Sequence, residues 1–267
     1  MTTVDANGIT IYYEREGSGP PLLFCNGSGA TLETSAPMLA PFRERFDVVA
    51  HDQRGLGRTS IPEPPYTMAE YAADAMAVVD AVGWDTCRVV GISFGGMVAQ
   101  ELAVTWPERV ERLALLCTSP GGAAGASYPL HELADLPTEQ RLERSVALLD
   151  TRFSPEWFAD PDHGADRALM EMLGRNAAGE KTPDQQRGEA AQLDARSHHD
   201  VTDRLARISC PTFVASGEFD GIAPVSNGRA IADRITDAQF HVYSGGHLFM
   251  VQDPTAMPDV LEFLSQP

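Results

Sequence analysis

The sequence has few basic residues for its number of acidic ones. It contains 20 lysines and arginines against 38 aspartates and glutamates, which gives a net charge of −18 at pH 7. Nucleic-acid binding needs a basic face, and anionic lipid surfaces attract basic segments. We therefore expect no nucleic-acid partner and no membrane partner, and a small molecule as the substrate. The composition is compatible with a monomer or a homo-oligomer.

Cysteines are scarce as well, and long apolar runs are missing. The four cysteines, Cys25, Cys87, Cys117 and Cys210, are widely spaced and form no Cys-x-x-Cys pair. Isolated cysteines of this kind are typically small buried hydrophobic residues, so we expect no disulfide. No apolar stretch approaches the roughly 20 residues of a membrane helix. Residues 1–8 lack the charged and apolar regions of a signal peptide, so we expect a cytoplasmic protein.

The most informative motif is Gly91-Ile92-Ser93-Phe94-Gly95. A short β-branched run precedes it and a helix-forming run follows it. A strand, then Gly-x-Ser-x-Gly, then a helix is typical of a nucleophile elbow. The glycines allow a turn so sharp that the Ser93 hydroxyl is exposed on a strained backbone. The N-terminus of the following helix supplies N–H groups that favour a negative charge nearby.

Strand-like and helix-like segments alternate along most of the chain. Short apolar runs predict strands, Asn7-Gly8 predicts a tight hairpin turn, and apolar residues at helical spacing predict helices. Strands that alternate with helices favour a mostly parallel sheet. We therefore expect an α/β fold with a mostly parallel, eight-stranded twisted sheet flanked by helices. The expected strands are residues 2–6, 9–16, 21–25, 46–50, 86–91, 110–117, 211–216 and 238–243, and the expected flanking helices include residues 35–45, 67–82, 224–235 and 253–264.

The segment from residue 119 to residue 207 has a different pattern. It contains helix-like stretches at residues 138–150, 164–175 and 184–195, and no clear strand. A helical insertion between two strands of a sheet indicates a lid. We therefore expect a core domain made of residues 1–118 and 208–267, with a helical lid at residues 119–207.

Two further residues complete a possible catalytic triad with Ser93. A serine hydroxyl needs an adjacent base, and that base must be oriented by an acid. Asp220 follows the strand at 211–216, and His247 follows the strand at 238–243. This order, serine, then acid, then histidine, is the one expected after a nucleophile elbow. Glu218 is the alternative acid, and each of the three could instead be an ordinary turn or loop residue.

The other half of an oxyanion hole should come from the loop after the strand at residues 21–25. That loop begins with Asn26 and continues Gly27-Ser28-Gly29. We expect the backbone N–H groups of Ser28 and Phe94 to be the two donors. The alternative is a glycine-rich turn that only joins the strand to the next helix.

These residues together resemble the α/β-hydrolase superfamily over nearly the whole chain. Within it, the chain is similar to 3-oxoadipate enol-lactonase-like hydrolases, whose oxyanion loop begins with asparagine, as Asn26 does here. The enol-lactonases usually read Asn-Ser-Leu-Gly in that loop, and Phe94 replaces their common Met or Gln. The motifs that match the superfamily or the enol-lactonases are Asp52-Gln53-Arg54-Gly55-Leu56-Gly57-Arg58-Thr59-Ser60, the elbow at 91–96 with Met97, residues 211–220 and Gly245-Gly246-His247.

Other residues are expected to have structural roles or to contact substrate. Asp52 and Arg54 are expected to brace the loops under the active site. The run 198–200 (His-His-Asp) lacks a second set of ligands, so we expect no metal. The residues expected to contact substrate are Asn26, Trp157 and Phe249.

The leading hypothesis is a serine hydrolase that cleaves a small carboxylic ester or lactone through an acyl-enzyme, without a cofactor. The same triad could instead hydrolyse a carbon–carbon bond or catalyse perhydrolysis with hydrogen peroxide. A different class of function would be a non-catalytic ligand-binding module that has kept the pocket. The superfamily uses one scaffold for many reactions, so the fold alone does not choose among them.

Overall fold

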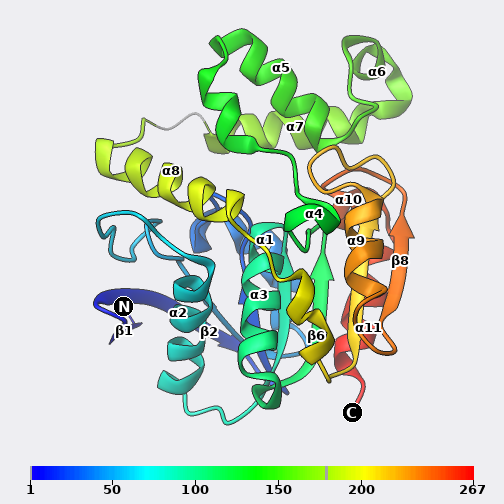
Figure 1. Ribbon diagram of the computed structural model, residues 1–267. Helices are drawn as coiled ribbons and strands as arrows, with labels where there is room; N and C mark the ends of the chain where they lie inside the picture. Colours follow the sequence, from blue (N-terminus) through cyan, green and yellow to red (C-terminus); the bar gives the residue numbers. More distant parts are fainter. Residues whose placement is uncertain (1, 178–179) are drawn as a thin grey trace.

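A single sheet forms the centre of the computed structural model, which describes residues 2–177 and 180–267. Its strands are β1 (Thr2–Ala6), β2 (Ile9–Gly17), β3 (Pro21–Cys25), β4 (Asp47–His51), β5 (Cys87–Ile92), β6 (Val110–Leu116), β7 (Thr212–Gly217) and β8 (Gln239–Tyr243). Across the sheet their order is β1-β2-β4-β3-β5-β6-β7-β8 (Figure 1). β2 pairs antiparallel with β1 and β4, and the other neighbours pair parallel. The predicted mostly parallel, eight-stranded sheet is confirmed.

The burial of each strand follows its position in the sheet. β5 and β7 are buried almost throughout, whereas the edge strand β1 has no fully buried residue. Helices on both faces of a parallel sheet exclude water from the central strands, which explains their continuous apolar runs. At the β1–β2 turn, Asn7 and Gly8 have φ angles of 51° and 77°, the left-handed conformation that a type I′ turn requires.

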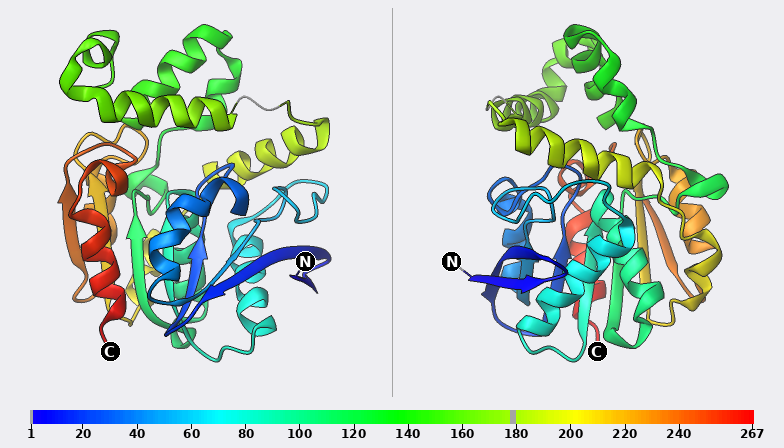
Figure 2. Two further views of the ribbon diagram at one scale, coloured as in Figure 1. Left: turned by 180° about the vertical axis from the view of Figure 1, so that it is seen from behind. Right: turned by 60° about the vertical axis from the view of Figure 1, so that its left-hand side comes forward.

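Helices cover the two faces of the sheet (Figure 2). On one face, α2 (Met68–Ala81), α3 (Phe94–Thr105) and α9 (Val225–Ala232) share a core with β5. On the other, α1 (Leu32–Arg43), α10 (Phe249–Gln252) and α11 (Ala256–Ser265) share a core with β3. Each fully buried leucine or phenylalanine in these cores contributes roughly 1.5–3 kcal/mol. The two cores hold the carboxyl ends of the strands in place beneath the candidate site.

Two helices differ from their predicted limits. α1 begins at Leu32, three residues early, because the Thr31 side chain accepts a hydrogen bond from the Thr34 amide and caps it. The helix expected at residues 253–264 is α11, which begins at Ala256 and follows the short helix α10. The carboxylate of Asp253 accepts hydrogen bonds from the amide and hydroxyl of Thr255 in the turn between the two helices. Capping explains the start of α1.

Helices make up the segment predicted as a lid. The helices between residues 138 and 197 lie over the carboxyl ends of the strands, whereas residues 202–207 pack against α3 (Figures 1 and 2). Across the described part of residues 119–207 there is no strand, only isolated bridges at Gly121. The division into a core domain (1–118 and 208–267) and a helical lid (119–207) stays a prediction. The segment contains α4 (Gly122–Gly125), α5 (Thr138–Leu149), α6 (Pro155–Ala159), α7 (Gly164–Ala177) and α8 (Pro183–Ser197), with 3-10 turns at Leu130–Asp135, Pro161–His163 and Thr202–Arg207.

Helix length and polarity bear on membrane insertion. None of the helices in the described ranges combines the length and the apolar character that crossing a bilayer demands.

Asp52 and Arg54 brace the loops after β4, as expected. Asp52 accepts hydrogen bonds from the amides of Leu32 (2.7 Å) and Arg58 (2.8 Å). Arg54 Nε lies 2.7 Å from Asp74 Oδ2, with side chains only 3% and 1% exposed. This buried ion pair ties the loop after β4 to α2.

Replacing Asp74 by alanine should destabilise the protein by about 3–5 kcal/mol, because it leaves the buried charge of Arg54 without its main partner. Urea unfolding followed by circular dichroism measures this loss. The control is Asp80→Ala, which removes an exposed partner of Arg109 and should cost about 1 kcal/mol or less. Equal losses in the two variants would contradict the prediction.

Candidate active site

Ser93 lies in a sharp turn between β5 and α3. Its φ and ψ angles are 55° and −117°, a strained conformation for any residue other than glycine. A side chain on Gly91 would collide with the backbone of Gly95, and one on Gly95 would collide with the carbonyl group of Cys25. Only glycine therefore allows the turn to pack this closely, and the turn leaves the Ser93 side chain partly exposed.

Hydrogen bonds from the neighbouring strand hold the strained backbone in place. The Ser93 amide donates to the Leu116 carbonyl at 2.8 Å, and Thr118 Oγ1 donates to the Ser93 carbonyl at 2.8 Å. Both partners come from the end of β6 and the loop after it. The position of the Ser93 hydroxyl is thus set by the sheet itself.

His247 lies between Ser93 and Asp220. Its Nε2 atom is 2.8 Å from Ser93 Oγ, and its Nδ1 atom is 2.7 Å from Asp220 Oδ2. The other carboxylate oxygen of Asp220 accepts from the amides of Ile222 (2.8 Å) and Ala223 (2.9 Å). The His247 ring thus lies within hydrogen-bond distance of both groups, with Nδ1 facing the carboxylate and Nε2 facing the serine hydroxyl.

The geometry distinguishes Asp220 from the alternative acid Glu218. Asp220 is 4% exposed and bonds directly to His247. Glu218 lies two residues earlier, and its side chain is exposed to solvent. Its amide bonds the Tyr243 carbonyl, so the backbone there only continues the pairing of β7 with β8.

The loop after β3 lies beside the serine. A side chain added to Gly27 would be 3.7 Å from Ser93 Cβ. Phe94 is the first residue of α3, so its N–H has no carbonyl of an earlier helical turn to bond. The loop that contains Ser28 thus passes close to Ser93, and the assignment of the Ser28 and Phe94 amides as oxyanion donors stays a prediction. Asn26 is 2% exposed, and its backbone carbonyl accepts from Gln53 Nε2 at 2.7 Å.

Two glutamines to which the sequence analysis assigned no role hold this loop. Gln192 of α8 accepts a hydrogen bond from the Gly29 amide at 2.8 Å and bonds Gln53 at 3.3 Å. Gln53 in turn bonds Asn26. Gln192 is 1% exposed, so these bonds are shielded from water. No motif could have indicated Gln192, because its partners lie more than 130 residues earlier.

Comparison with known proteins agrees with the fold. Residues 20–254 match the family model of the alpha/beta hydrolase fold. The chain belongs to the α/β-hydrolase family. Its structure superposes on the crystal structure of an enol-lactonase from Burkholderia xenovorans LB400 with a TM-score of 0.81 and 22% identity, over 99% of this chain and 100% of the other.

Two curated relatives cover nearly the whole chain of this α/β-hydrolase. A poly(3-hydroxyalkanoate) depolymerase from Ectopseudomonas oleovorans is 30% identical over 92% of this chain and 84% of its own length. The 3-oxoadipate enol-lactonase 2 from Acinetobacter baylyi is 27% identical over 97% of this chain and 94% of its own. The resemblance to 3-oxoadipate enol-lactonases is therefore confirmed.

Trp157 and Phe249, two residues expected to contact substrate, lie in packed surroundings. The ring of Trp157 stacks on His163 at 3.5 Å and also lies beneath the Arg152 guanidinium, and its Nε1 donates to Asp166. These partners hold Trp157 within the lid segment. Phe249 is 0% exposed and stacks on Tyr243 in the core beside α11. Phe249 therefore packs in this core, and its contact with substrate stays a prediction.

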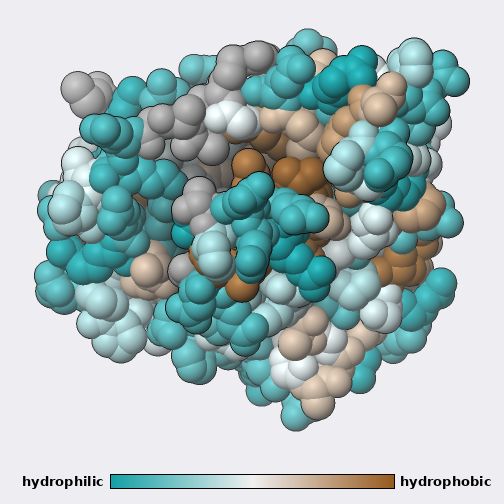
Figure 3. Space-filling view, turned by 90° about the horizontal axis from the view of Figure 1, so that it is seen from above, coloured by the Kyte–Doolittle hydropathy of each residue, from teal (hydrophilic) through white to brown (hydrophobic). Residues whose placement is uncertain are grey.

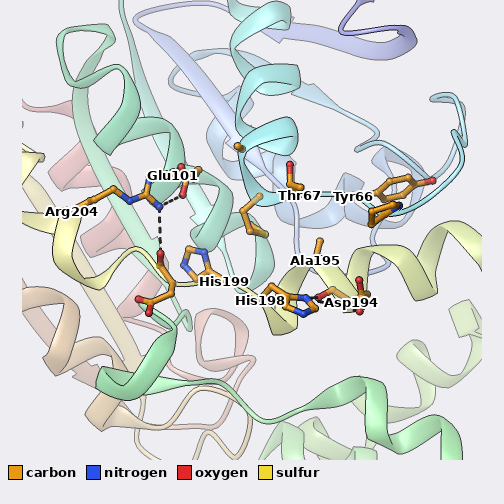
Figure 4. A pocket seen from close by; sticks show the side chains of 12 residues that line it. Tyr66, Thr67, Glu101, Asp194, Ala195, His198, His199 and Arg204 are labelled. Carbon is orange, nitrogen blue, oxygen red and sulfur yellow. Dashed lines mark hydrogen bonds and ion pairs between the residues drawn. The ribbon is translucent and has the colours of Figure 1, made fainter.

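Two cavities open near the C-terminal end of α8. The α2-side cavity, of about 440 Å³, lies between that end and the start of α2, and Figure 4 shows it from close by. The lid-base cavity, of about 370 Å³, lies between the same end and residues 121–131. Neither is lined by a residue of the Ser93–His247–Asp220 group. From above, apolar residues gather in a hollow bordered by hydrophilic ones (Figure 3).

His199 borders both cavities and lies close to Glu101 and Arg204 (Figure 4). Burial lowers the pKa of His199 to about 4, against the opposing effect of the Glu101 and Asp200 carboxylates. Among the described residues, no group of three His, Cys, Asp or Glu side chains has the geometry of a metal site. His199 is therefore best described as a buried neutral imidazole.

The buried His199 should make the protein less stable as the pH falls from 6.5 to about 4. In this window the unfolded chain binds a proton at His199 and the folded protein does not. The free energy of unfolding of the wild-type protein should decrease between about pH 7 and about pH 4.5. In His199→Leu this decrease should be smaller by roughly 2–3 kcal/mol. Urea unfolding at the two pH values measures both decreases. The control, His198→Leu, removes an exposed imidazole, and an equal change there would refute the prediction.

Proposed function

We propose that this protein is a serine hydrolase that cleaves a small carboxylic ester or lactone through an acyl-enzyme. The observation that carries the proposal is the continuous hydrogen-bonded path from Ser93 Oγ through His247 to Asp220, with distances of 2.8 and 2.7 Å. The names of the relatives, an enol-lactonase and a poly(3-hydroxyalkanoate) depolymerase, support this class of substrate.

In acylation, Ser93 Oγ attacks the substrate carbonyl carbon while His247 Nε2 accepts the hydroxyl proton. The new C–O bond converts the carbonyl oxygen to an oxyanion. When the tetrahedral intermediate collapses, the bond to the leaving oxygen breaks, and His247 returns its proton to that alkoxide. Asp220 stabilises the imidazolium that forms between the two transfers. The acyl group remains on Ser93; from a lactone, it still carries the freed hydroxyl.

The oxyanion is stabilised by the N–H groups of Ser28 and Phe94. Phe94 begins α3, whose N-terminus adds the partial positive charge of the helix dipole. The hydrogen bonds of Gln192 and Gln53 hold the loop that carries Ser28 in position beside Ser93. A preorganised donor of this kind contributes roughly 3 kcal/mol to the transition state.

In deacylation, a water molecule takes the place of the leaving alcohol. His247 accepts a proton from the water as its oxygen attacks the acyl carbon, and the bond to Ser93 Oγ then breaks. Ser93 recovers its proton from His247, and the carboxylic acid leaves. The net reaction is hydrolysis, and every proton transfer uses residues of the same three-residue path.

Replacing Ser93 by alanine should abolish ester hydrolysis, with a loss of about four orders of magnitude or more in kcat. Turnover of short p-nitrophenyl esters and a small lactone measures this loss. A fluorophosphonate probe should label the wild-type protein and the control Ser265→Ala, but not Ser93→Ala. Persistent labelling or turnover in Ser93→Ala would rule out Ser93 as the nucleophile.

Asp220→Asn should reduce kcat by about 10⁴-fold, because the amide favours the wrong imidazole tautomer. The matched control is Glu218→Gln, at an exposed position two residues earlier, which should change kcat by less than about threefold. Both rates are measured with the same p-nitrophenyl ester. A larger loss at Glu218 would assign the acid to that residue.

A further inference from the structure

The end of α5 packs between the two loops that follow β7 and β8. Its Leu148 carbonyl accepts a hydrogen bond from the Gly221 amide at 3.0 Å, and its Leu149 carbonyl accepts one from the His247 amide at 2.6 Å. The close approach requires glycine, because a side chain on Gly246 would collide with the Leu149 carbonyl oxygen. The helical segment thus bonds the proposed base itself and the residue that follows the proposed acid.

Asp150, the next residue along the chain, is a carboxylate completely shielded from solvent. It is 0% exposed, and its two oxygens accept hydrogen bonds from two side chains. Arg152 donates to Oδ1 from its amide (3.0 Å) and from Nε (2.8 Å), and to Oδ2 from Nη2 (2.6 Å). Gln252 Nε2 donates to Oδ2 at 3.0 Å. A buried carboxylate with this many charge-assisted bonds fixes the positions of both partners.

Gln252, the last residue of α10, links Asp150 to the histidine loop. Its Oε1 atom accepts a hydrogen bond at 2.8 Å from the amide of Gly246, the residue directly before His247. Its Nε2 atom bonds Asp150 and also lies 3.2 Å from Asp166 Oδ1 of α7. Because the amide oxygen faces the loop and the amide nitrogen faces the carboxylates, the side chain bridges the loop to the helical segment.

Arg152 makes the corresponding contact on the side of the acid. Its guanidinium carbon lies 4.0 Å from the centre of the ring of Phe219, the residue directly before Asp220. The Thr151 amide also donates to the Phe219 carbonyl at 2.9 Å. A cation above an aromatic ring is attracted by the negative face of that ring. The ion pair of Asp150 and Arg152 therefore contacts both loops.

We propose that Asp150 and Gln252 are positioning residues, which hold the His247 loop so that Nε2 stays within hydrogen-bond reach of Ser93 Oγ. This inference rests on the proposed serine hydrolase function. In that reaction His247 accepts the serine proton and returns it to the leaving alkoxide, and both transfers slow down when the reacting atoms are misplaced. Asp150 and Gln252 act through the backbone of the loop and exchange no proton themselves.

Gln252→Met keeps the length of the side chain and removes both hydrogen-bonding groups. It should lower kcat at least about tenfold and change KM by less than about threefold. The loss in kcat/KM should be larger for ethyl butanoate than for p-nitrophenyl butanoate, because ethoxide must be protonated by His247 as it leaves and p-nitrophenolate need not. Rates are expressed per site labelled to completion by a fluorophosphonate, so that unfolded protein does not count. The matched control, Gln239→Met at an exposed position on β8, should leave both rates unchanged.

Asp150→Asn should lower kcat in the same way, because the amide has lost the negative charge and one acceptor oxygen. If Asp150 acts through Gln252, the double variant should be about as slow as the slower single variant instead of showing the product of the two losses. The control is Asp162→Asn, at an exposed position in the same helical segment. Circular dichroism checks folding, and Gln252→Met alone carries the comparison of the two esters if Asp150→Asn does not fold.

Equal losses for the two esters, or losses that multiply in the double variant, would overturn the proposal, because independent weakening of the fold produces both. Amide hydrogen exchange in Ser93→Ala needs no turnover and so separates this inference from the proposed function. There Gln252→Met should speed exchange at the His247 amide at least about tenfold, although Gln252 does not bond that amide, and leave exchange in β5 unchanged. Faster exchange would support the hold on the loop even in a protein without hydrolase activity, whereas unchanged exchange would overturn it.

Discussion

The close packing of the start of α3 against the ends of three strands is the constraint on which the candidate site depends. Gly91 and Gly95 leave no room for a side chain, and the strained backbone of Ser93 persists because β6 and the loop after it bond both its amide and its carbonyl. Strain of this kind costs about 1–3 kcal/mol and survives only where the surroundings determine the conformation. The result is a serine hydroxyl held 2.8 Å from His247.

α8 connects the helical segment to both sides of this site. Near its middle, Gln192 bonds the loop proposed to hold the oxyanion, and near its end Arg196 bonds the segment next to Asp220. Gly188 lies so close to Gly55 that a side chain there would meet its carbonyl oxygen. One helix thus bonds the loop proposed to carry an oxyanion donor and also bonds Tyr128, whose amide in turn bonds Ile222 in the loop after Asp220.

Single residues show where sequence reasoning was sufficient. Ser93, Asp220 and His247 each follow a strand, and parallel strands bring their carboxyl ends to one edge, so local pattern and topology together placed them near one another. The packing of Phe249 and Trp157 shows the opposite case. The sequence did not indicate that Phe249 is completely buried or that Trp157 stacks on His163, because the hydrophobic character of a side chain does not specify which surface it will cover.

The sequence by itself determined the elbow, the alternation of strands and helices, and the order of the three polar residues, because each depends on local backbone preferences and spacing. Only the tertiary structure shows that Asp220 Oδ2 lies 2.7 Å from His247 Nδ1 and that Gln192 bonds the loop after β3. These contacts join residues far apart in the chain, whose distances follow from how helices pack on the sheet. Packing of that kind is a property of the whole fold and leaves no periodic signal in any one segment.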